Sequence, residues 1–124
     1  MTTNTTKADI KTRKDIERLV DSFYEKVRAD ELLSPVFAHL DWPAHLPTMY
    51  NFWSSLLFGD KSYEGNPFMA HKHLSINESH FTRWLELFTE TVDQEFTGER
   101  ASELKQRAQS IAAVFQHRMG LRIR

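Results

Sequence analysis

The chain has 124 residues, 40% of them hydrophobic and 27% charged, a balance typical of one soluble globular domain. Sixteen basic and seventeen acidic residues give a net charge of −1, which argues against nucleic-acid binding through phosphate contacts. Cysteine is absent, and this excludes disulfides, thiolate nucleophiles, iron–sulfur clusters and cysteine-bound zinc. No apolar run approaches the ~18 residues of a membrane span, and the polar N-terminal stretch does not resemble a secretory signal. We therefore expect a cytoplasmic monomer with no nucleic-acid or membrane partner.

The first predicted helix begins after Thr12, which is a suitable N-cap with Asp15 in the first turn. Apolar residues then recur with the helical period of 3.6 up to about residue 30. They are Ile16, Leu19, Val20, Phe23 and Val27. A tight connection around Pro35 follows.

The second predicted helix begins at Asp41-Trp42-Pro43, because Asp suits the cap and Pro suits the first turn. Pro47 removes a backbone hydrogen bond inside a helix, so we expect an irregular helix as far as Pro47 and a regular one from there to Phe58. Gly59 ends it. Its apolar positions cover more than half of the circumference and predict burial on two sides: Leu46, Met49, Tyr50, Phe52, Trp53, Leu56 and Leu57.

Two further long helices are predicted in the second half of the chain. A polar loop over 60–66 and a short turn of helix up to about Lys72 precede them. Asn77 is a suitable cap for the first of the two, whose apolar positions are Phe81, Trp84, Leu85, Phe88 and Val92. Thr97-Gly98 separates it from the last helix, over about 99–119. Its inward positions are Leu104, Ala108, Ile111, Phe115 and Met119.

These elements predict an all-α fold of four substantial helices and one short one, without strands. We expect a flexible N-terminal tail over 1–11, one domain over 12–120 and a C-terminal tail over 121–124. The sequence has no glycine-rich phosphate loop, no nucleophile elbow and no helix-turn-helix with a basic face. His71, His73 and His80 cluster in the sequence, but no HExxH motif accompanies them, so a zinc site is not favoured.

Four polar side chains stand beside apolar helix positions, namely Tyr24, His45, His71 and Trp84. Taken singly, each has an ordinary explanation, as a surface histidine or as an aromatic residue of the core. Together they offer one imidazole and three further hydrogen-bonding groups among Phe and Met residues. An apolar slot with one ligand and a few hydrogen bonds is what a planar porphyrin requires.

Five sequence blocks occur here in the order and spacing of a known family. They are FYEKVRADELLSPVF at 23–37, His45 with Asn51-Phe52-Trp53, YEGNPFMAH at 63–71, HFTRWLELF at 80–88 and RAQSIAAVFQHRM at 107–119. On these blocks, the chain resembles a truncated haemoglobin of the third group over about residues 14–119. The resemblance implies a two-over-two helical sandwich around haem b.

The resemblance also assigns roles to single residues. It makes His71 the proximal ligand of the haem iron, with His73 as the alternative, and places Tyr24, His45 and Trp84 on the distal, ligand-binding side. It implies an apolar pocket wall formed by Phe37, Met49, Phe52, Phe81, Ile111 and Phe115. Pro47, just after His45, allows the alternative that His45 tilts towards solvent.

The expected function is binding of O2, NO, CO or similar small ligands, with O2-dependent detoxification of NO as a further activity. That activity needs an external reductase, because the sequence has no flavin or nicotinamide motif. Two donors near the ligand predict slow ligand release, which suits sensing, scavenging or redox chemistry better than oxygen transport. The alternatives are a peroxidase-like enzyme with His45 as the acid–base group, and a haem-free helical interaction module.

Overall fold

In the computed structural model, the residues that can be described are 7–37, 41–59 and 77–118. They form four helices and no strand: α1 (Arg13–Ala29), α2 (Trp42–Phe58), α4 (Glu78–Glu95) and α5 (Glu99–Arg118). The predicted all-α fold is therefore confirmed.

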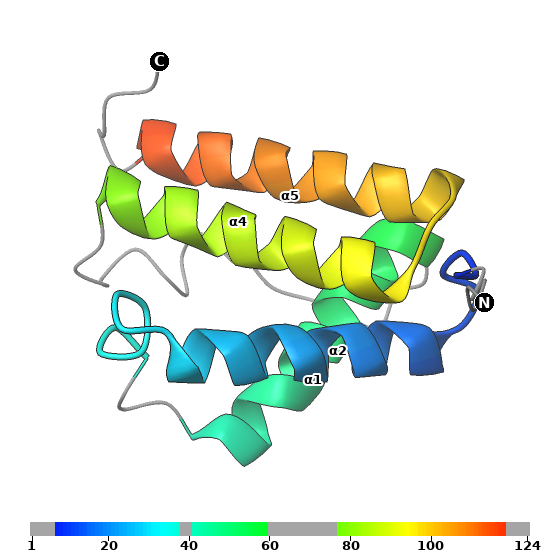
Figure 1. The fold of residues 1–124 in the computed structure, drawn as a ribbon, viewed down its shortest axis with the longest axis horizontal. Helices are drawn as coiled ribbons and strands as arrows, with labels where there is room; N and C mark the ends of the chain where they lie inside the picture. The colour runs from blue at the N-terminus through cyan, green and yellow to red at the C-terminus, as the bar shows by residue number, and fades with distance from the viewer. Residues whose placement is uncertain (1–6, 38–40, 60–76, 119–124) are drawn as a thin grey trace, which may run out of the picture.

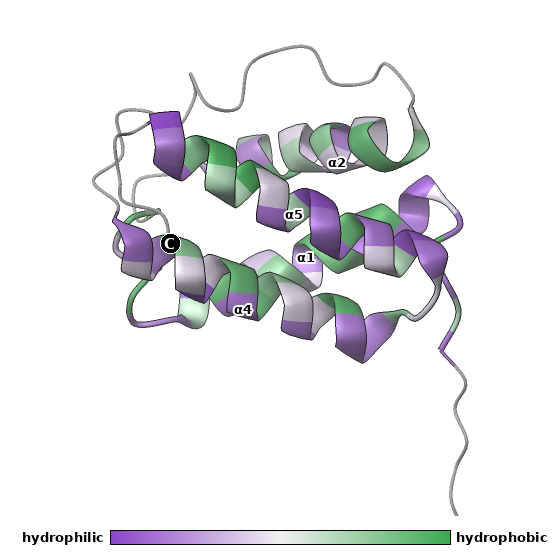
Figure 2. Cartoon of the chain, turned by 90° about the horizontal axis from the view of Figure 1, so that it is seen from above, coloured by the Kyte–Doolittle hydropathy of each residue, from purple (hydrophilic) through white to green (hydrophobic). Residues whose placement is uncertain are grey.

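The helices form two stacked pairs. The antiparallel helices α4 and α5 lie side by side, and α2 crosses behind α1 (Figure 1). Contacts of α1 with α4 and of α2 with α5 join the two pairs, which is a two-over-two arrangement. In Figure 2, α4 and α5 alternate between hydrophilic and hydrophobic strips, as amphipathic helices do, whereas much of α2 is hydrophobic.

Helix α1 begins after the predicted N-cap Thr12, which forms a capping box with Asp15. The Thr12 hydroxyl accepts a hydrogen bond from the Asp15 N–H at 3.4 Å, and the Asp15 carboxylate accepts one from the Thr12 N–H at 3.1 Å. The buried face of the helix contains every apolar residue predicted for it, with Tyr24 in addition: Ile16, Leu19, Val20, Phe23, Tyr24 and Val27. The helical period therefore predicted both the length of α1 and its buried side.

Helix α2 differs from the prediction in its first turns. We expected irregular structure as far as Pro47, but the helix is continuous from Trp42 with Pro47 inside it. Pro47 removes a single backbone hydrogen bond, and the first turn is held by the N–H groups of Ala44 and His45, which donate to the Asp41 carbonyl at 3.0 and 2.8 Å. His45 thus stands on a regular helix, and Gly59 ends α2 with a φ of 72°.

Helices α4 and α5 also begin and end close to the expected residues. The Asn77 side chain accepts a hydrogen bond from the Ser79 N–H at 2.9 Å, which confirms the predicted cap of α4. In α5, Leu104 and Ala108 are buried as predicted, together with Ala101 and Ala112. Ile111 and Phe115 are only half-buried.

The segment before α1 departs from the expected flexible tail. Ile10 is 1% exposed, and the Thr97 N–H donates to the Ala8 carbonyl at 3.1 Å. The Asp9 carboxylate accepts hydrogen bonds from the first backbone N–H groups of α5, those of Arg100 at 3.0 Å and Ala101 at 2.9 Å. A side chain distant in sequence therefore caps α5, and the segment lies against the turn between α4 and α5 (Figure 1).

Several predicted elements lie outside the described residues. These are the polar loop over 60–66, the short helix after it, Met119, the C-terminal tail over 121–124 and residues 1–6 of the N-terminal tail. Within the described ranges, none of the helices combines the length and the apolar character that crossing a membrane requires.

Candidate functional site

Tyr24 is a buried tyrosine on α1, with 6% of its surface exposed. Burial raises the pKa of its hydroxyl far above the ordinary value, and a hydrogen bond with the Trp84 side chain offsets only part of that rise. An indole N–H can only donate, so the Tyr24 oxygen is the acceptor. Tyr24 is therefore a neutral phenol across the physiological pH range and keeps its own proton.

His45 on α2 packs against two aromatic rings that also contact each other. Its ring centroid is 5.7 Å from that of Tyr24 and 5.5 Å from that of Trp42, with interplanar angles of 84° and 83°. The residue is half-buried, and its Nε2 atom is fully buried. The imidazole is thus directed inward, in contrast to the alternative in which Pro47 tilts it towards solvent.

Trp84 on α4 is held by a stack of aromatic rings. Its ring is 5.5 Å from Phe88 at an interplanar angle of 12°, and Phe88 is 4.8 Å from Trp53 at 25°. Phe23 meets Trp84 edge-on at 5.7 Å. Because these neighbours fix the plane of the indole, the Trp84 N–H has a defined direction towards Tyr24.

The structure therefore brings together Tyr24, His45 and Trp84, three residues far apart in the sequence that we call the distal trio. Each comes from a different helix, and none of the three is a carboxylate. The described ranges contain no group of three or more His, Cys, Asp or Glu side chains that could hold a bare metal ion. The trio is thus suited to donating hydrogen bonds to a small ligand rather than to chelating a metal.

The residues predicted as pocket walls divide into two sets. Phe37, Met49 and Phe52 belong to the core or pack against it, and the ring of Phe37 is 6.2 Å from that of Trp42, next to the distal trio. Phe81 pairs edge-on with Phe115 at 6.4 Å, and Ile111 packs against the core from α5. His71 and His73, the proposed proximal ligand and its alternative, lie outside the described residues.

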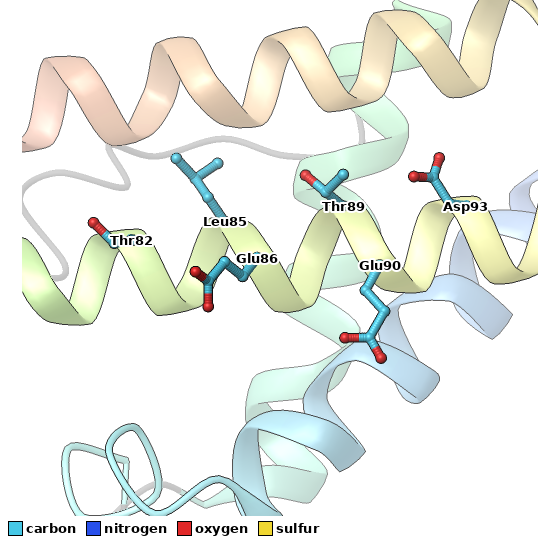
Figure 3. A pocket seen from close by; sticks show the side chains of 6 residues that line it. All are labelled: Thr82, Leu85, Glu86, Thr89, Glu90 and Asp93. Atoms are coloured by element: carbon cyan, nitrogen blue, oxygen red, sulfur yellow. The ribbon is translucent and has the colours of Figure 1, made fainter.

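An open groove on the outer side of α4 is a separate feature. It is lined by Thr82, Leu85, Glu86, Thr89, Glu90 and Asp93 and has a volume of about 500 Å³ (Figure 3). None of the predicted site residues lines it. Two of its carboxylates are in ion pairs, Glu86 with Arg83 at 3.1 Å and Asp93 with Lys105 at 2.7 Å, so the groove belongs to the charged surface of the helix.

Sequence reasoning missed one neighbour of the distal trio. Trp42 was interpreted only as part of a helix start, yet its ring lies 5.3 Å from Tyr24 as well as against His45. The spacing of Trp42 and His45 in the sequence could have indicated their contact, because residues three apart share one face of a helix. Trp42 therefore had to lie beside His45 wherever α2 was regular.

Comparison with known proteins assigns this chain to a family. The profile of the bacterial-like globins matches residues 9–119. The group 3 truncated hemoglobin ctb of Campylobacter jejuni is 35% identical over 112 residues, which are 85% of this chain and 88% of that protein. The group 1 truncated hemoglobin GlbN of Nostoc commune is 33% identical over 67 residues, 53% of this chain and 57% of that protein.

Solved structures agree with the sequence comparisons. The crystal structure of group III truncated hemoglobin from Campylobacter jejuni has a TM-score of 0.83 and 34% identity, covering 92% of this chain and 95% of that chain. The crystal structure of truncated hemoglobin from Tetrahymena pyriformis, in its Fe(III) form, has a TM-score of 0.67 and 24% identity, covering 87% of this chain and 90% of that chain. At this identity, the match shows the fold alone. This chain belongs to the bacterial-like globins. The resemblance to the third group of truncated haemoglobins is thereby confirmed.

Membership of the globins makes haem the cofactor of this chain. The residues present fit that group, because a buried phenol, an indole N–H and an imidazole gather beside apolar side chains without a carboxylate among them. Such a donor set suits the open side of a haem, where a neutral small ligand acquires partial negative charge. The alternative of a haem-free helical module loses its basis.

Proposed function

We propose that this globin binds O2 or a related diatomic ligand, that Tyr24 and His45 hold the ligand by hydrogen bonds while Trp84 orients Tyr24, and that His71 is the proximal ligand of the iron. One observation carries the proposal. The Tyr24 hydroxyl accepts the Trp84 N–H while burial keeps its own proton in place. Tyr24 is thus a permanent donor whose orientation is set by a second residue.

Haem, when bound, would supply an iron that binds a diatomic ligand and gives it partial negative charge. Tyr24 then acts on that ligand in a definite way. A hydroxyl has one proton and two lone pairs, and Trp84 occupies one of the lone pairs. The proton is directed away from the indole and is available to the ligand. Donation from Trp84 also polarises the Tyr24 O–H, which strengthens its own hydrogen bond.

His45 supplies a second group, with its ring centroid 5.7 Å from that of Tyr24. Its inward orientation places it where it can donate to the ligand or accept a proton from it. The aromatic and aliphatic neighbours of the trio exclude water, which would otherwise compete for these hydrogen bonds. A ligand held in this way leaves slowly.

Slow release favours scavenging, sensing or redox chemistry over oxygen transport. We propose O2-dependent detoxification of NO, in which NO, O2 and one electron give nitrate. The electron comes from an external reductase, because the sequence has no flavin or nicotinamide motif of its own. The inward imidazole of His45 favours one second candidate, a peroxidase-like activity in which His45 transfers the proton of a bound peroxide.

Two measurements test the proposal. The purified protein is expected to show an intense Soret band that is lost in His71→Ala and kept in His73→Ala. Stopped-flow mixing of the oxygenated protein with NO is expected to produce nitrate stoichiometrically, whereas turnover of peroxide with an organic reductant is expected to be slow. Fast peroxide turnover together with no nitrate would favour the second candidate.

A further inference from the structure

Trp42 contacts both His45 and Tyr24. It is the first residue of α2, stands three positions before His45 on the same helix face and is half-buried. Its ring meets His45 edge-on at 5.5 Å, lies 5.3 Å from Tyr24 and packs on Phe37 at 6.2 Å. The Trp42 ring therefore packs against the imidazole and the phenol at the same time.

Trp42 is itself covered by a cation. The guanidinium carbon of Arg28 lies 5.2 Å from the centroid of the Trp42 ring, within the range of a cation–π interaction. Arg28 is exposed and follows Tyr24 by four residues, so α1 carries both Tyr24 and the cation that rests on Trp42. The two helices are thus tied together at the outer edge of the distal trio.

We propose that Trp42, held by Arg28, is a positioning residue that keeps the His45 imidazole against Tyr24 and so limits how often His45 swings out to solvent. The inference rests on the proposed function, since it concerns the same site. It assigns Trp42 and Arg28 no contact with the ligand. Their effect is on the population of the inward orientation of His45 and on the rate at which a ligand enters past it.

The chain offers a matched control for Arg28. Arg100 lies 4.9 Å from the ring centroid of Phe58, which is at the opposite end of α2 from His45. Arg100→Ala removes a cation–π contact of the same kind from an equally exposed position. A general loss of surface charge or packing would affect Arg28→Ala and Arg100→Ala alike, whereas a positioning role affects Arg28→Ala alone.

The first experiment measures the orientation of His45 in the CO-bound holoprotein. The C–O stretching band in the infrared reports the polarity next to CO, and we expect a second band, from protein with His45 outward, to grow in Arg28→Ala and further in Trp42→Ala. Proton NMR of the parent protein and of Arg28→Ala, which both keep Trp42, provides a direct reading, because the His45 ring protons lose the ring-current shift of Trp42 when the imidazole leaves. Trp42→Phe, which keeps an aromatic ring, is expected to stay close to the parent protein.

The second experiment measures CO association after flash photolysis. We expect the rate to rise about two- to fivefold in Arg28→Ala, the population change that loss of an exposed cation–π contact produces. A rise of about tenfold is expected in Trp42→Ala, which also removes the edge-to-face contacts of the ring with its aromatic neighbours. Arg100→Ala is expected to leave the rate and the infrared band unchanged.

The inference is overturned if Arg28→Ala and Trp42→Ala both leave the infrared bands and the association rate as in the parent protein, or if Arg100→Ala changes them equally. Should Trp42→Ala fail to fold, Arg28→Ala decides the question, because Arg28 is exposed. Tyr24→Phe distinguishes a wrong positioning role for Trp42 and Arg28 from a wrong proposed function. Faster O2 loss in Tyr24→Phe with no effect of Arg28→Ala rejects the positioning role and leaves the proposed function standing.

Discussion

Tyr24→Phe is the most direct test of the distal trio, because it removes one hydroxyl and leaves the ring. The ring keeps its contacts with Phe23 at 4.8 Å and with Trp42 at 5.3 Å, so the packing of α1 on α2 is preserved. What is lost is the hydrogen bond from the Tyr24 O–H to a ligand with partial negative charge. The effect therefore appears in ligand release rather than in folding.

The size of the effect follows from two opposing contributions. A hydrogen bond to a charged acceptor contributes about 1.5–3 kcal/mol, which corresponds to an increase of about ten- to a hundredfold in the rate of release. Against this, the Trp84 N–H loses its acceptor on Tyr24 and becomes free to donate to the ligand itself. We therefore expect the lower part of the range, an O2 dissociation rate at least ten times that of the parent protein.

The assay is stopped-flow replacement of O2 by CO in the ferrous protein. Tyr50→Phe is the matched control, because Tyr50 is a tyrosine of α2 whose hydroxyl donates to the Asp21 carboxylate at the surface, away from the trio. Its O2 dissociation rate is expected to equal that of the parent protein. An unchanged rate in Tyr24→Phe, in a variant with normal unfolding by urea, would refute the role given to Tyr24.

Three further predictions follow from other contacts. Trp84→Phe keeps an aromatic ring in the stack but removes the N–H that orients Tyr24, so O2 dissociation is expected to accelerate less than in Tyr24→Phe, and the double variant is expected to be non-additive. Asp9→Ala removes the cap of α5 and is expected to lower the free energy of unfolding by about 0.5–2 kcal/mol at pH 7, measured by urea denaturation. Burial acts to raise the pKa of Asp9, but hydrogen bonds from backbone N–H groups and the charge of Arg100 outweigh it and hold the pKa below the usual 3.8. The cap therefore contributes fully above about pH 4, and its advantage over Asp9→Ala is expected to vanish as the pH falls through the lowered pKa; a difference that grows in acid would contradict this. Gly98→Ala is expected to be more destabilising than Gly59→Ala in the same urea assay, because Gly98 has a φ of 137° and an added Cβ would lie 2.5 Å from the Asp9 Cγ, whereas nothing lies within 4 Å of a Cβ at Gly59.

Local chemistry was enough to predict the ends of the helices. Thr12 and Asn77 cap where their side chains predicted, and Gly59 ends α2 in the left-handed conformation that glycine tolerates. The prediction of an irregular helix before Pro47 was wrong because it considered only the lost backbone hydrogen bond. Packing of α2 against two other helices outweighs the loss of one bond, and no local pattern reports that packing.

The cap of α5 could not be predicted in the same way. A helix is normally capped by the residue that precedes it, and the sequence before Glu99 offers Gly98, which has no side chain. Asp9 supplies the missing acceptor from the other end of the chain. Residues 8–10 therefore belong to the folded domain, although the composition of the sequence before α1 resembles that of a loose tail.

The candidate site shows the same division between local and non-local information. Tyr24, His45 and Trp84 could be given roles from the sequence only through the resemblance to a family, because each alone is an ordinary helix residue. The hydrogen bond between Trp84 and Tyr24 depends on where α4 packs against α1, and the contacts of Trp42 depend on where α2 crosses α1. Periodicity fixes which face of a helix a residue occupies but not which residue of another helix it meets. That is why Trp42, correctly placed at a helix start, could be recognised as a neighbour of Tyr24 only once the helices were seen together.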